Sequence, residues 1–208
     1  MQNKIKNIAI QGIAGSFHEE ASRQFFTKCE IKFSFCDTFE HVFQQIKENN
    51  HTGVVAIENS LAGSILPNYG AIQFYNLNII GETYRKIEQN LMALPGTNLS
   101  NINEIWSHPM ALRQCQEFLN KYPKIKSVEK EDTAKSAYLI KKNQLKNTAA
   151  IASETACKMY GMNILKKGIQ SNKMNFTRFL ILSKNKTSIK QPNKATLCFS
   201  VSNTTGSL

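Results

Sequence analysis

Residues 54–57 form an unbroken apolar run, Val-Val-Ala-Ile, which limits the folds open to this chain. A strand that is apolar on both of its faces is typical of a sheet covered by helices on both sides. The segment before it has helical spacing instead, with apolar side chains at Val42, Phe43 and Ile46. The run therefore predicts a layered α/β fold.

Signals for strands and helices alternate along the rest of the chain. Apolar runs predict further strands at 5–10, at 105–106, at 149–152 and within 172–182. Ser16 and Glu19 form a capping box for the first helix, and Pro109 suits a first helical turn because no N–H donor is needed there. Asp132 and Ser153 are expected to cap two later helices. This alternation also predicts an α/β architecture.

Polar residues gather where strands are followed by helices. These junctions lie at residues 12–16, 58–64, 107–109 and 153–154. Free N–H groups and the positive end of the helix dipole meet at such places, and open α/β sheets bind ligands beyond the carboxyl ends of their strands. The pattern predicts a site for a small anion.

Composition restricts the classes of partner. The 208 residues are 41% hydrophobic, enough for one domain or two small lobes. No apolar stretch approaches the ~20 residues of a membrane span, and the first apolar run breaks at Gln11, so a cytoplasmic protein without a membrane partner is expected. The net charge of +11 comes from dispersed lysines, which favours dianionic metabolites over nucleic acid.

Cysteine and histidine spacing gives no sign of a cofactor. The five cysteines are scattered without a C-x-x-C pair, so we expect reduced, mostly buried thiols. The four histidines lack the spacing of metal ligands. Neither a metal nor another cofactor is expected.

Thr177 and Arg178 stand at the mouth of the last long apolar run. Arg178 offers a planar fork of donors to a carboxylate, and Thr177 can hydrogen-bond a neighbouring oxygen. The alternative is an edge-strand arginine in a surface ion pair. Phe179, next in the chain, is more typical of a core residue than of a ring that stacks on substrate.

The 58–64 junction combines a carboxylate, an amide and two hydroxyls, in Glu58, Asn59, Ser60 and Ser64. Asn59 can donate and accept at once, which suits a site that grips a departing hydroxyl. A helix cap with solvated neighbours explains the same residues equally well.

Two other junctions carry weaker signals. Gly15 and Ser16 could cradle an anion, although an ordinary turn has the same residues. His108 at a helix start would stay neutral, because the helix N-terminus disfavours the imidazolium, but a structural histidine is the commoner case. Gln114 is either a solvated helix residue or a ligand contact.

Taken in order, these segments resemble the prephenate dehydratase family over about residues 7–182. The motifs that carry the resemblance are Gly12-x-x-Gly15-Ser-Phe, Gly53-Val-Val-Ala-Ile-Glu-Asn-Ser60, Gly63-Ser64, Ser107-His-Pro109 with Gln114-Cys115, Ala149-Ala-Ile-Ala-Ser-Glu154, Tyr160-Gly161 and Asn175-x-Thr-Arg-Phe179. The sequence departs from the family pattern at Met110, Asn90 and Ala56, which bears on fine substrate contacts.

The resemblance implies two α/β lobes like those of type 2 periplasmic binding proteins, with the active site in the cleft between them. By this scheme the catalytic domain covers 1–186, with lobe one at 1–79 plus 171–186 and lobe two at 80–170. Residues 187–193 would be a linker. Residues 194–208, with a strand expected at 196–201, resemble the start of a truncated ACT regulatory domain.

The resemblance also implies roles for individual residues. The implied catalytic residues are Thr177, Asn59, Glu58, Ser107 and Gln114. The implied substrate-binding residues are Arg178, Ser60, Ser64, Gly15, Ser16, His108 and Phe179. In this scheme Thr177, supported by Asn59 and Ser107, contacts the leaving hydroxyl, and Glu58 or a water supplies the proton.

The implied reaction is the decarboxylating dehydration of prephenate to phenylpyruvate, water and carbon dioxide. Arogenate dehydratase is one alternative, and a non-catalytic domain of the same fold that binds a small acid is another. Phenylalanine is expected as a feedback effector only with a complete ACT domain. The full-length form is expected to be a homodimer or homotetramer.

Overall fold

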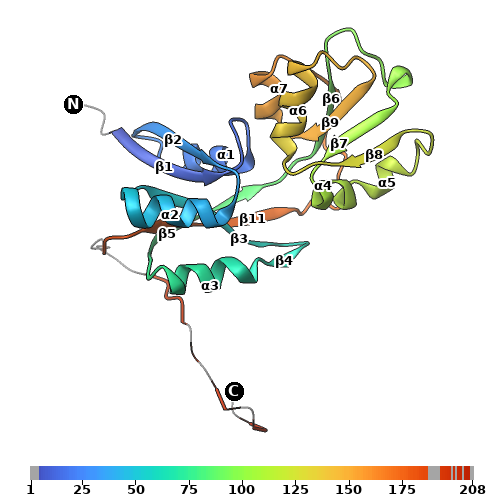
Figure 1. Cartoon of the computed structure of the whole chain (residues 1–208). Coiled ribbons are helices and arrows are strands. Elements are labelled where there is room, and N and C mark those ends of the chain that lie inside the picture. Colours follow the sequence, from blue (N-terminus) through green and yellow to red (C-terminus); the bar gives the residue numbers. More distant parts are fainter. Residues whose placement is uncertain (1–4, 187–192, 198, 200, 203, 207–208) are drawn as a thin grey trace.

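The computed structural model describes residues 5–186, 193–197, 199, 201–202 and 204–206. The helices and strands between residues 5 and 183 form two α/β lobes, each built on one sheet (Figure 1). The two lobes lie side by side, and strands β5 and β11 run from the first lobe towards the second. This is the type 2 periplasmic-binding-protein-like class expected from the sequence.

The first lobe contains a mixed sheet with the strand order β2-β1-β3-β11-β5. Its strands are β1 (Ile5–Gln11), β2 (Glu30–Cys36), β3 (Thr52–Asn59), β5 (Asn78–Lys86) and β11 (Phe176–Ser183), and the short β4 (Gly63–Ser64) pairs with β3. Its helices are α1 (Phe17–Phe25), α2 (Phe39–Asn49) and α3 (Leu66–Phe74). The run Val54–Ile57 lies inside β3 and is buried throughout, as expected.

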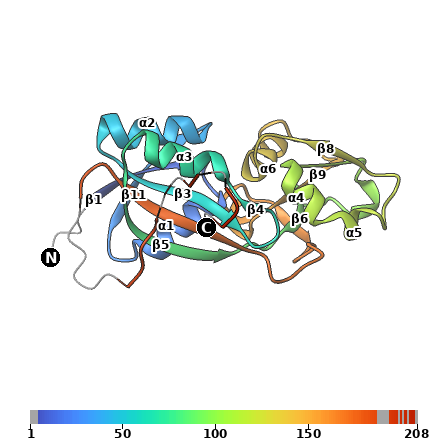
Figure 2. The same ribbon diagram turned by 90° about the horizontal axis from the view of Figure 1, so that it is seen from below.

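Helices cover both faces of this sheet. Helix α1 packs on one face, in a core that includes Val54 and Phe179. Helices α2 and α3 pack on the other, in a core that includes Val55 and Leu180. Figure 2 shows α2 and α3 on one side of β3 and β11, and α1 on the other. Alternate residues of β11 therefore face different helices.

The second lobe contains a sheet with the order β10-β6-β9-β7-β8. Its strands are β6 (Asn90–Ala93), β7 (Glu104–Ser107), β8 (Lys126–Glu129), β9 (Thr148–Ala152) and β10 (Asn163–Lys166). Its helices are η1 (Leu99–Asn101), α4 (Pro109–Gln114), α5 (Gln116–Leu119), α6 (Thr133–Lys142) and α7 (Glu154–Met159). Strands β7, β8 and β9 are parallel, so their carboxyl ends lie at the same edge.

The chain crosses between the lobes after β5 and again before β11. Strand β5 pairs with β11 up to the pair Lys86 and Phe176, so the first sheet extends well past the lobe boundary expected at residue 79. That boundary was wrong because β5 is an edge strand. Its second half, with Gly81, Glu82 and Arg85, lacks the apolar run that marks a central strand.

The helix caps form largely as the sequence predicts. Ser16 accepts a hydrogen bond from the Glu19 N–H at 3.3 Å, and Asp132 and Ser153 accept from the third residue beyond each cap. The capping box differs in one bond. The Glu19 carboxylate accepts from the Gly15 N–H at 2.7 Å, one residue earlier than expected.

Two expected elements differ from the structure. Residues 58–64 do not open a helix, because the chain turns back at residues 60–62 and forms β4 against β3. The described residues within 196–201 are not in a strand, since this segment finds no partner strand to pair with. Residues 187–192 of the expected linker lie outside the described part of the chain.

Within the described part, no helix is long and apolar enough to cross a membrane.

A close backbone contact joins the two lobes at Gly15. The Ser153 hydroxyl donates to the Gly15 carbonyl at 2.7 Å, and the Tyr160 hydroxyl donates to the Ala14 carbonyl at 2.5 Å. Gly15 has φ +87°, and a Cβ there would lie 2.8 Å from Ala156 Cα. Only glycine satisfies both the backbone angle and this approach.

Gly15→Ala should therefore destabilise the protein by about 3 kcal/mol, the sum of a left-handed alanine and a clash with α7. Gly63→Ala is the matched control, because Gly63 also has positive φ, +81°, but faces open space. Denaturant unfolding of both variants measures the difference. Equal losses at the two positions would contradict a close contact between the lobes at Gly15.

Candidate active site

A group of polar side chains lies where the chain crosses between the lobes. We call it the amide cluster, and it consists of Asn59, Gln89, Gln114, Asn175 and Thr177. Asn59 ends β3, Thr177 is the second residue of β11 and Gln114 ends α4, whereas Gln89 and Asn175 belong to the two crossing segments. The cluster therefore draws side chains from both lobes.

Asn59 and Thr177 face each other across the β3–β11 ladder. The Asn59 Nδ2 group lies 3.0 Å from Thr177 Oγ1, 2.7 Å from Asn175 Oδ1 and 3.1 Å from the Phe176 carbonyl. Its Oδ1 accepts from the N–H groups of Leu61 at 3.0 Å and of Ala62 at 2.9 Å. Both ends of the Asn59 carboxamide are thus hydrogen-bonded.

Gln114 receives hydrogen bonds from both crossing segments. Asn175 Nδ2 donates to Gln114 Oε1 at 2.9 Å, and Gln89 Nε2 lies 3.5 Å from the same oxygen. The backbone adds to this junction, because Ile87 N–H donates to the Asn175 carbonyl at 2.8 Å and Ser171 N–H donates to the Gln114 carbonyl at 2.8 Å.

The cluster is sheltered from water. Asn175 is fully buried, Gln89 is 3% exposed, and Thr177 and Asn59 keep 8% and 9% exposure. Gln89 Oε1 is buried without a hydrogen-bond partner among the described residues. Polar contacts in such a place are stronger than in water, so a ligand oxygen that reaches Thr177 meets a strong hydrogen bond.

Sequence reasoning assigned no role to Asn175 or Gln89. Asn175 lies two residues before Thr177, the spacing of residues on one face of a strand, and this signal was available. Gln89 gave no signal, because its partner Gln114 and its other contact, Gln170, come from distant parts of the chain.

The structure does not bring Arg178 and Glu58 to Thr177. Successive side chains of a strand point to opposite faces, and Arg178 pairs in the ladder with Glu58, not with Asn59. The Arg178 guanidinium binds Glu82 at 2.7 Å and lies 3.9 Å from Glu58. Arg178 and Thr177 therefore point to opposite faces of β11, and Glu58 lies on the face of Arg178. Arg178 instead joins β11 to β5.

Ser107 and Phe179 are core residues. The Ser107 hydroxyl is fully buried and donates to the Ile151 carbonyl at 2.6 Å, so it ties β7 to β9 and cannot support Thr177. Phe179 is 1% exposed and packs under α1. The interpretation of Phe179 as a core residue is confirmed. Its expected role in binding substrate is corrected.

The small residues of the two turns also have structural partners. Gly15 and Ser16 are buried in the contacts that start α1 and join it to α7. Ser60 Oγ donates to the Met174 carbonyl and accepts from the Phe176 N–H, which fastens the end of β3 to the start of β11. Ser64 is exposed on β4. The structure thus gives Gly15 and Ser16 no open surface for a ligand.

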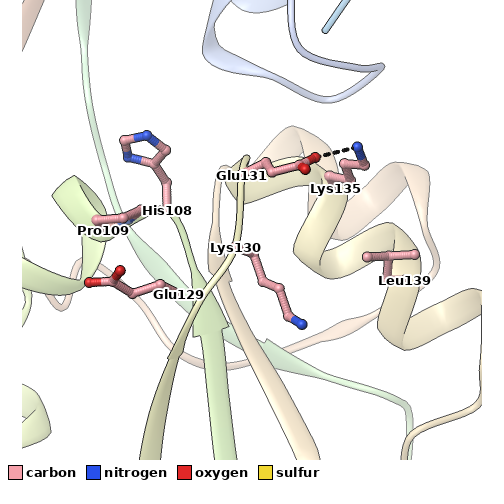
Figure 3. Close-up of a pocket in the computed structure, with 7 residues that line it drawn as sticks. All are labelled: His108, Pro109, Glu129, Lys130, Glu131, Lys135 and Leu139. Carbon is pink, nitrogen blue, oxygen red and sulfur yellow. Dashed lines mark hydrogen bonds and ion pairs between the residues drawn. The ribbon is translucent and has the colours of Figure 1, made fainter.

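His108 lies at the start of α4, at the opposite end of this helix from Gln114. It borders a cavity of about 700 Å³ lined by His108, Pro109, Glu129, Lys130, Glu131, Lys135 and Leu139 (Figure 3). Burial lowers the pKa of His108, Asp132 opposes this shift and Arg113 adds to it. His108 Nδ1 accepts from the Met110 N–H at 3.2 Å. The neutral imidazole expected from the sequence agrees with this direction.

Charges of both signs surround this cavity. Glu131 and Lys135 form an ion pair at 2.6 Å, and the Lys130 ammonium lies 4.0 Å from the centre of the Trp106 ring.

A second cavity, of about 1030 Å³, is lined by residues that include Arg178, Glu82 and Lys194. Thr177 lines neither of the two cavities. Although burial works against it, hydrogen bonds from Lys194 and Arg178 hold the pKa of Glu82 below its usual value.

Among the described residues, no group of three or more histidine, cysteine, aspartate or glutamate side chains could hold a metal ion. The hydrogen-bonding groups of the amide cluster are carboxamides and a hydroxyl. Neutral donors and acceptors of this kind bind and orient oxygen atoms.

His18 supports β11 from behind. Its ring packs edge-on against Phe179 and Phe39, with centroids 5.1 and 5.5 Å away, and Nε2 accepts from the Ala56 N–H at 3.3 Å. Burial lowers the pKa of His18 to about 4. The ring is therefore neutral at pH 7 and part of the packing that holds the strand of Thr177.

These features define a two-lobed α/β protein with a neutral polar site between its lobes. The family model described as prephenate dehydratase matches residues 8–187. The chain belongs to the prephenate dehydratase family.

Relatives of known function come from plants and bacteria. The chain is 37% identical over 178 residues to arogenate dehydratase/prephenate dehydratase 2 of Arabidopsis thaliana, covering 85% of this chain and 46% of the relative. It is 32% identical over 206 residues to the bifunctional chorismate mutase/prephenate dehydratase of Escherichia coli, covering 97% of this chain and 53% of the relative. The chain thus spans about half the length of these relatives.

Solved structures share the fold. The prephenate dehydratase of Arthrobacter aurescens in complex with L-Phe is 26% identical, with a TM-score of 0.81 over 89% of this chain and 63% of that one. A structure described as GqqA, a quorum quenching acylase, is 28% identical, with a TM-score of 0.78 over 90% of this chain and 67% of that one.

The lowered pKa of His18 predicts a pH effect on stability. The unfolded chain binds the proton near pH 6.5 and the folded chain only near 4, so the free energy of unfolding should fall as the pH drops from 6.5 to about 4. His18→Gln keeps an acceptor for Ala56 N–H and should reduce this fall. Urea unfolding at pH 7 and pH 5 measures it, with His41→Gln on the surface as the control. An unchanged difference in His18→Gln would refute the burial of a neutral His18.

Proposed function

We propose that this chain catalyses the decarboxylating dehydration of prephenate to phenylpyruvate, water and carbon dioxide. Membership of the prephenate dehydratase family supports the proposal. The observation that carries it is the hydrogen bond from Asn59 to Thr177, because it determines what the Thr177 hydroxyl offers to a ligand.

The orientation of Asn59 follows from its backbone partners. The N–H groups of Leu61 and Ala62 can only donate, so Asn59 must turn its oxygen to them and its NH₂ group to Thr177. Thr177 Oγ1 is then an acceptor for Asn59. Its own hydroxyl proton stays available to a ligand oxygen.

A sheltered hydroxyl donor suits the departure of the 4-hydroxyl group of prephenate. Aromatisation of the ring supplies the driving force, so the protein has to orient the substrate and stabilise the leaving oxygen. Threonine is a very weak acid, and Glu58 lies with Arg178 on the other face of the sheet. We therefore assign Thr177 the role of hydrogen-bond donor to the leaving oxygen, and a water molecule the role of proton source.

Arogenate is the second candidate substrate, and the printed name of the Arabidopsis relative includes both activities. The two substrates differ only in an amine or a keto group on the side chain, away from the leaving hydroxyl. Incubation with each substrate, followed by detection of phenylpyruvate or phenylalanine, tests the proposal and ranks the two. Binding of both without product formation would instead favour the non-catalytic alternative, a domain that binds a small acid.

Regulation and assembly complete the proposal. The Arthrobacter protein was solved with L-Phe, which supports phenylalanine as an effector of such enzymes. We propose that feedback by phenylalanine requires a complete ACT domain, of which residues 194–208 resemble the beginning, and that the complete protein is a homodimer or homotetramer. A cytoplasmic location belongs to the same proposal.

Thr177→Val removes the hydroxyl and keeps the shape of the side chain. It should lower kcat by about 10²-fold, the loss measured when one transition-state hydrogen-bond donor is removed, with little change in stability. Thr177→Ser keeps the hydroxyl and should keep most of the activity. Steady-state kinetics of both variants decide the point, and near wild-type turnover by Thr177→Val would show that Thr177 is not the donor.

A further inference from the structure

Asn175 lies between a carboxamide of the first lobe and a carboxamide of the second. Its Oδ1 accepts from Asn59 Nδ2 at 2.7 Å, and its Nδ2 donates to Gln114 Oε1 at 2.9 Å. Asn175 itself is fully buried in the segment that crosses between the lobes. It is therefore in contact with both sides of the amide cluster.

The direction of these hydrogen bonds is set by the main chain. Leu61 and Ala62 N–H fix the oxygen of Asn59, so the Asn59 NH₂ group is directed at Asn175. Asn175 must then turn its oxygen to Asn59 and its NH₂ group to Gln114. Gln114 must present its oxygen in turn, because two NH₂ groups cannot form a hydrogen bond with each other. The Gln114 NH₂ group is thereby directed away from Asn175.

Gln89 is compatible with the same orientation of Gln114. Its Nε2 is a second donor directed at Gln114 Oε1, at 3.5 Å. A reversed Gln114 would place its NH₂ group against the NH₂ group of Asn175, whose direction is set through Asn59. Within the described part of the chain, both hydrogen bonds of the Gln114 side chain go to its oxygen.

We propose that Asn175 is a positioning residue that transmits the orientation set at Asn59 to Gln114, so that the Gln114 NH₂ group is held as a donor to the bound substrate. This inference rests on the proposed function for the identity of that substrate, a small acid with carboxylate and hydroxyl oxygens. One backbone turn at Leu61 and Ala62 then orients two donors, the Thr177 hydroxyl of the first lobe and the Gln114 amide of the second.

Neutron diffraction from deuterated crystals of the wild-type protein tests the orientation directly, because it distinguishes ND₂ from oxygen. We expect the ND₂ group of Asn175 to face Gln114 and the ND₂ group of Gln114 to face away. An ND₂ group of Gln114 that faces Asn175 would overturn the proposal. This test does not depend on turnover, so it stands even if the protein converts neither prephenate nor arogenate.

A double-mutant cycle tests the consequence for catalysis. Asn175→Leu leaves Asn59 its bonds to Thr177 and to the Phe176 carbonyl but frees Gln114 to rotate, and should lower kcat roughly tenfold or more. In the Gln114→Leu background the same change should have little further effect on kcat. Losses that multiply would overturn the positioning role.

Asn172→Leu is the matched control, since Asn172 lies exposed in the same segment and its side chain accepts a hydrogen bond from the Met174 N–H at 2.8 Å, outside the amide cluster. Its kcat should stay close to that of the wild type. An equal loss in Asn172→Leu would show that the effect of Asn175→Leu comes from the segment as a whole, which would also overturn the proposal.

Discussion

The hydrogen bonds from the backbone of Leu61 and Ala62 to Asn59 are the constraint on which the site depends. A carboxamide is nearly symmetric in shape, and its chemical direction is decided only by its partners. Two backbone donors settle that direction at Asn59, and they arise because the chain turns tightly at residues 60–62 before it forms β4. The chemistry available at Thr177 thus follows from the geometry of a turn.

The sheet of the first lobe separates two kinds of polar chemistry. On the α1 face, Thr177 and Asn59 belong to the sheltered amide cluster, whose own members are all uncharged. On the other face, Arg178 is held by Glu82 and Glu58 in an ion-paired group that joins β11 to its neighbours. Arg85 lies opposite Thr177 in the β5–β11 ladder, on the α1 face, and Glu20 of α1 holds it in an ion pair at 2.8 Å.

Much of the fold could be predicted from sequence because it rests on local signals. The buried run Val54–Ile57 and the caps at Asp132 and Ser153 follow from residue type and spacing. The polar edge strand β5 lacks such a signal. The site was harder to predict. Thr177 and Arg178 are adjacent in the chain, which suggested a shared site, but adjacent residues of a strand point to opposite faces. The partnership of Gln89 with Gln114 depends on how the lobes meet, which no local pattern encodes.

The central claim is that Asn59 acts through Thr177, by taking up the acceptor side of its hydroxyl and leaving the proton for the substrate. A double-mutant cycle on kcat with Asn59→Leu and Thr177→Val measures this coupling most directly. If the claim holds, the double variant is no slower than the worse single variant, within about twofold. Losses that multiply in the double variant would show that Asn59 and Thr177 act independently, and would contradict this account.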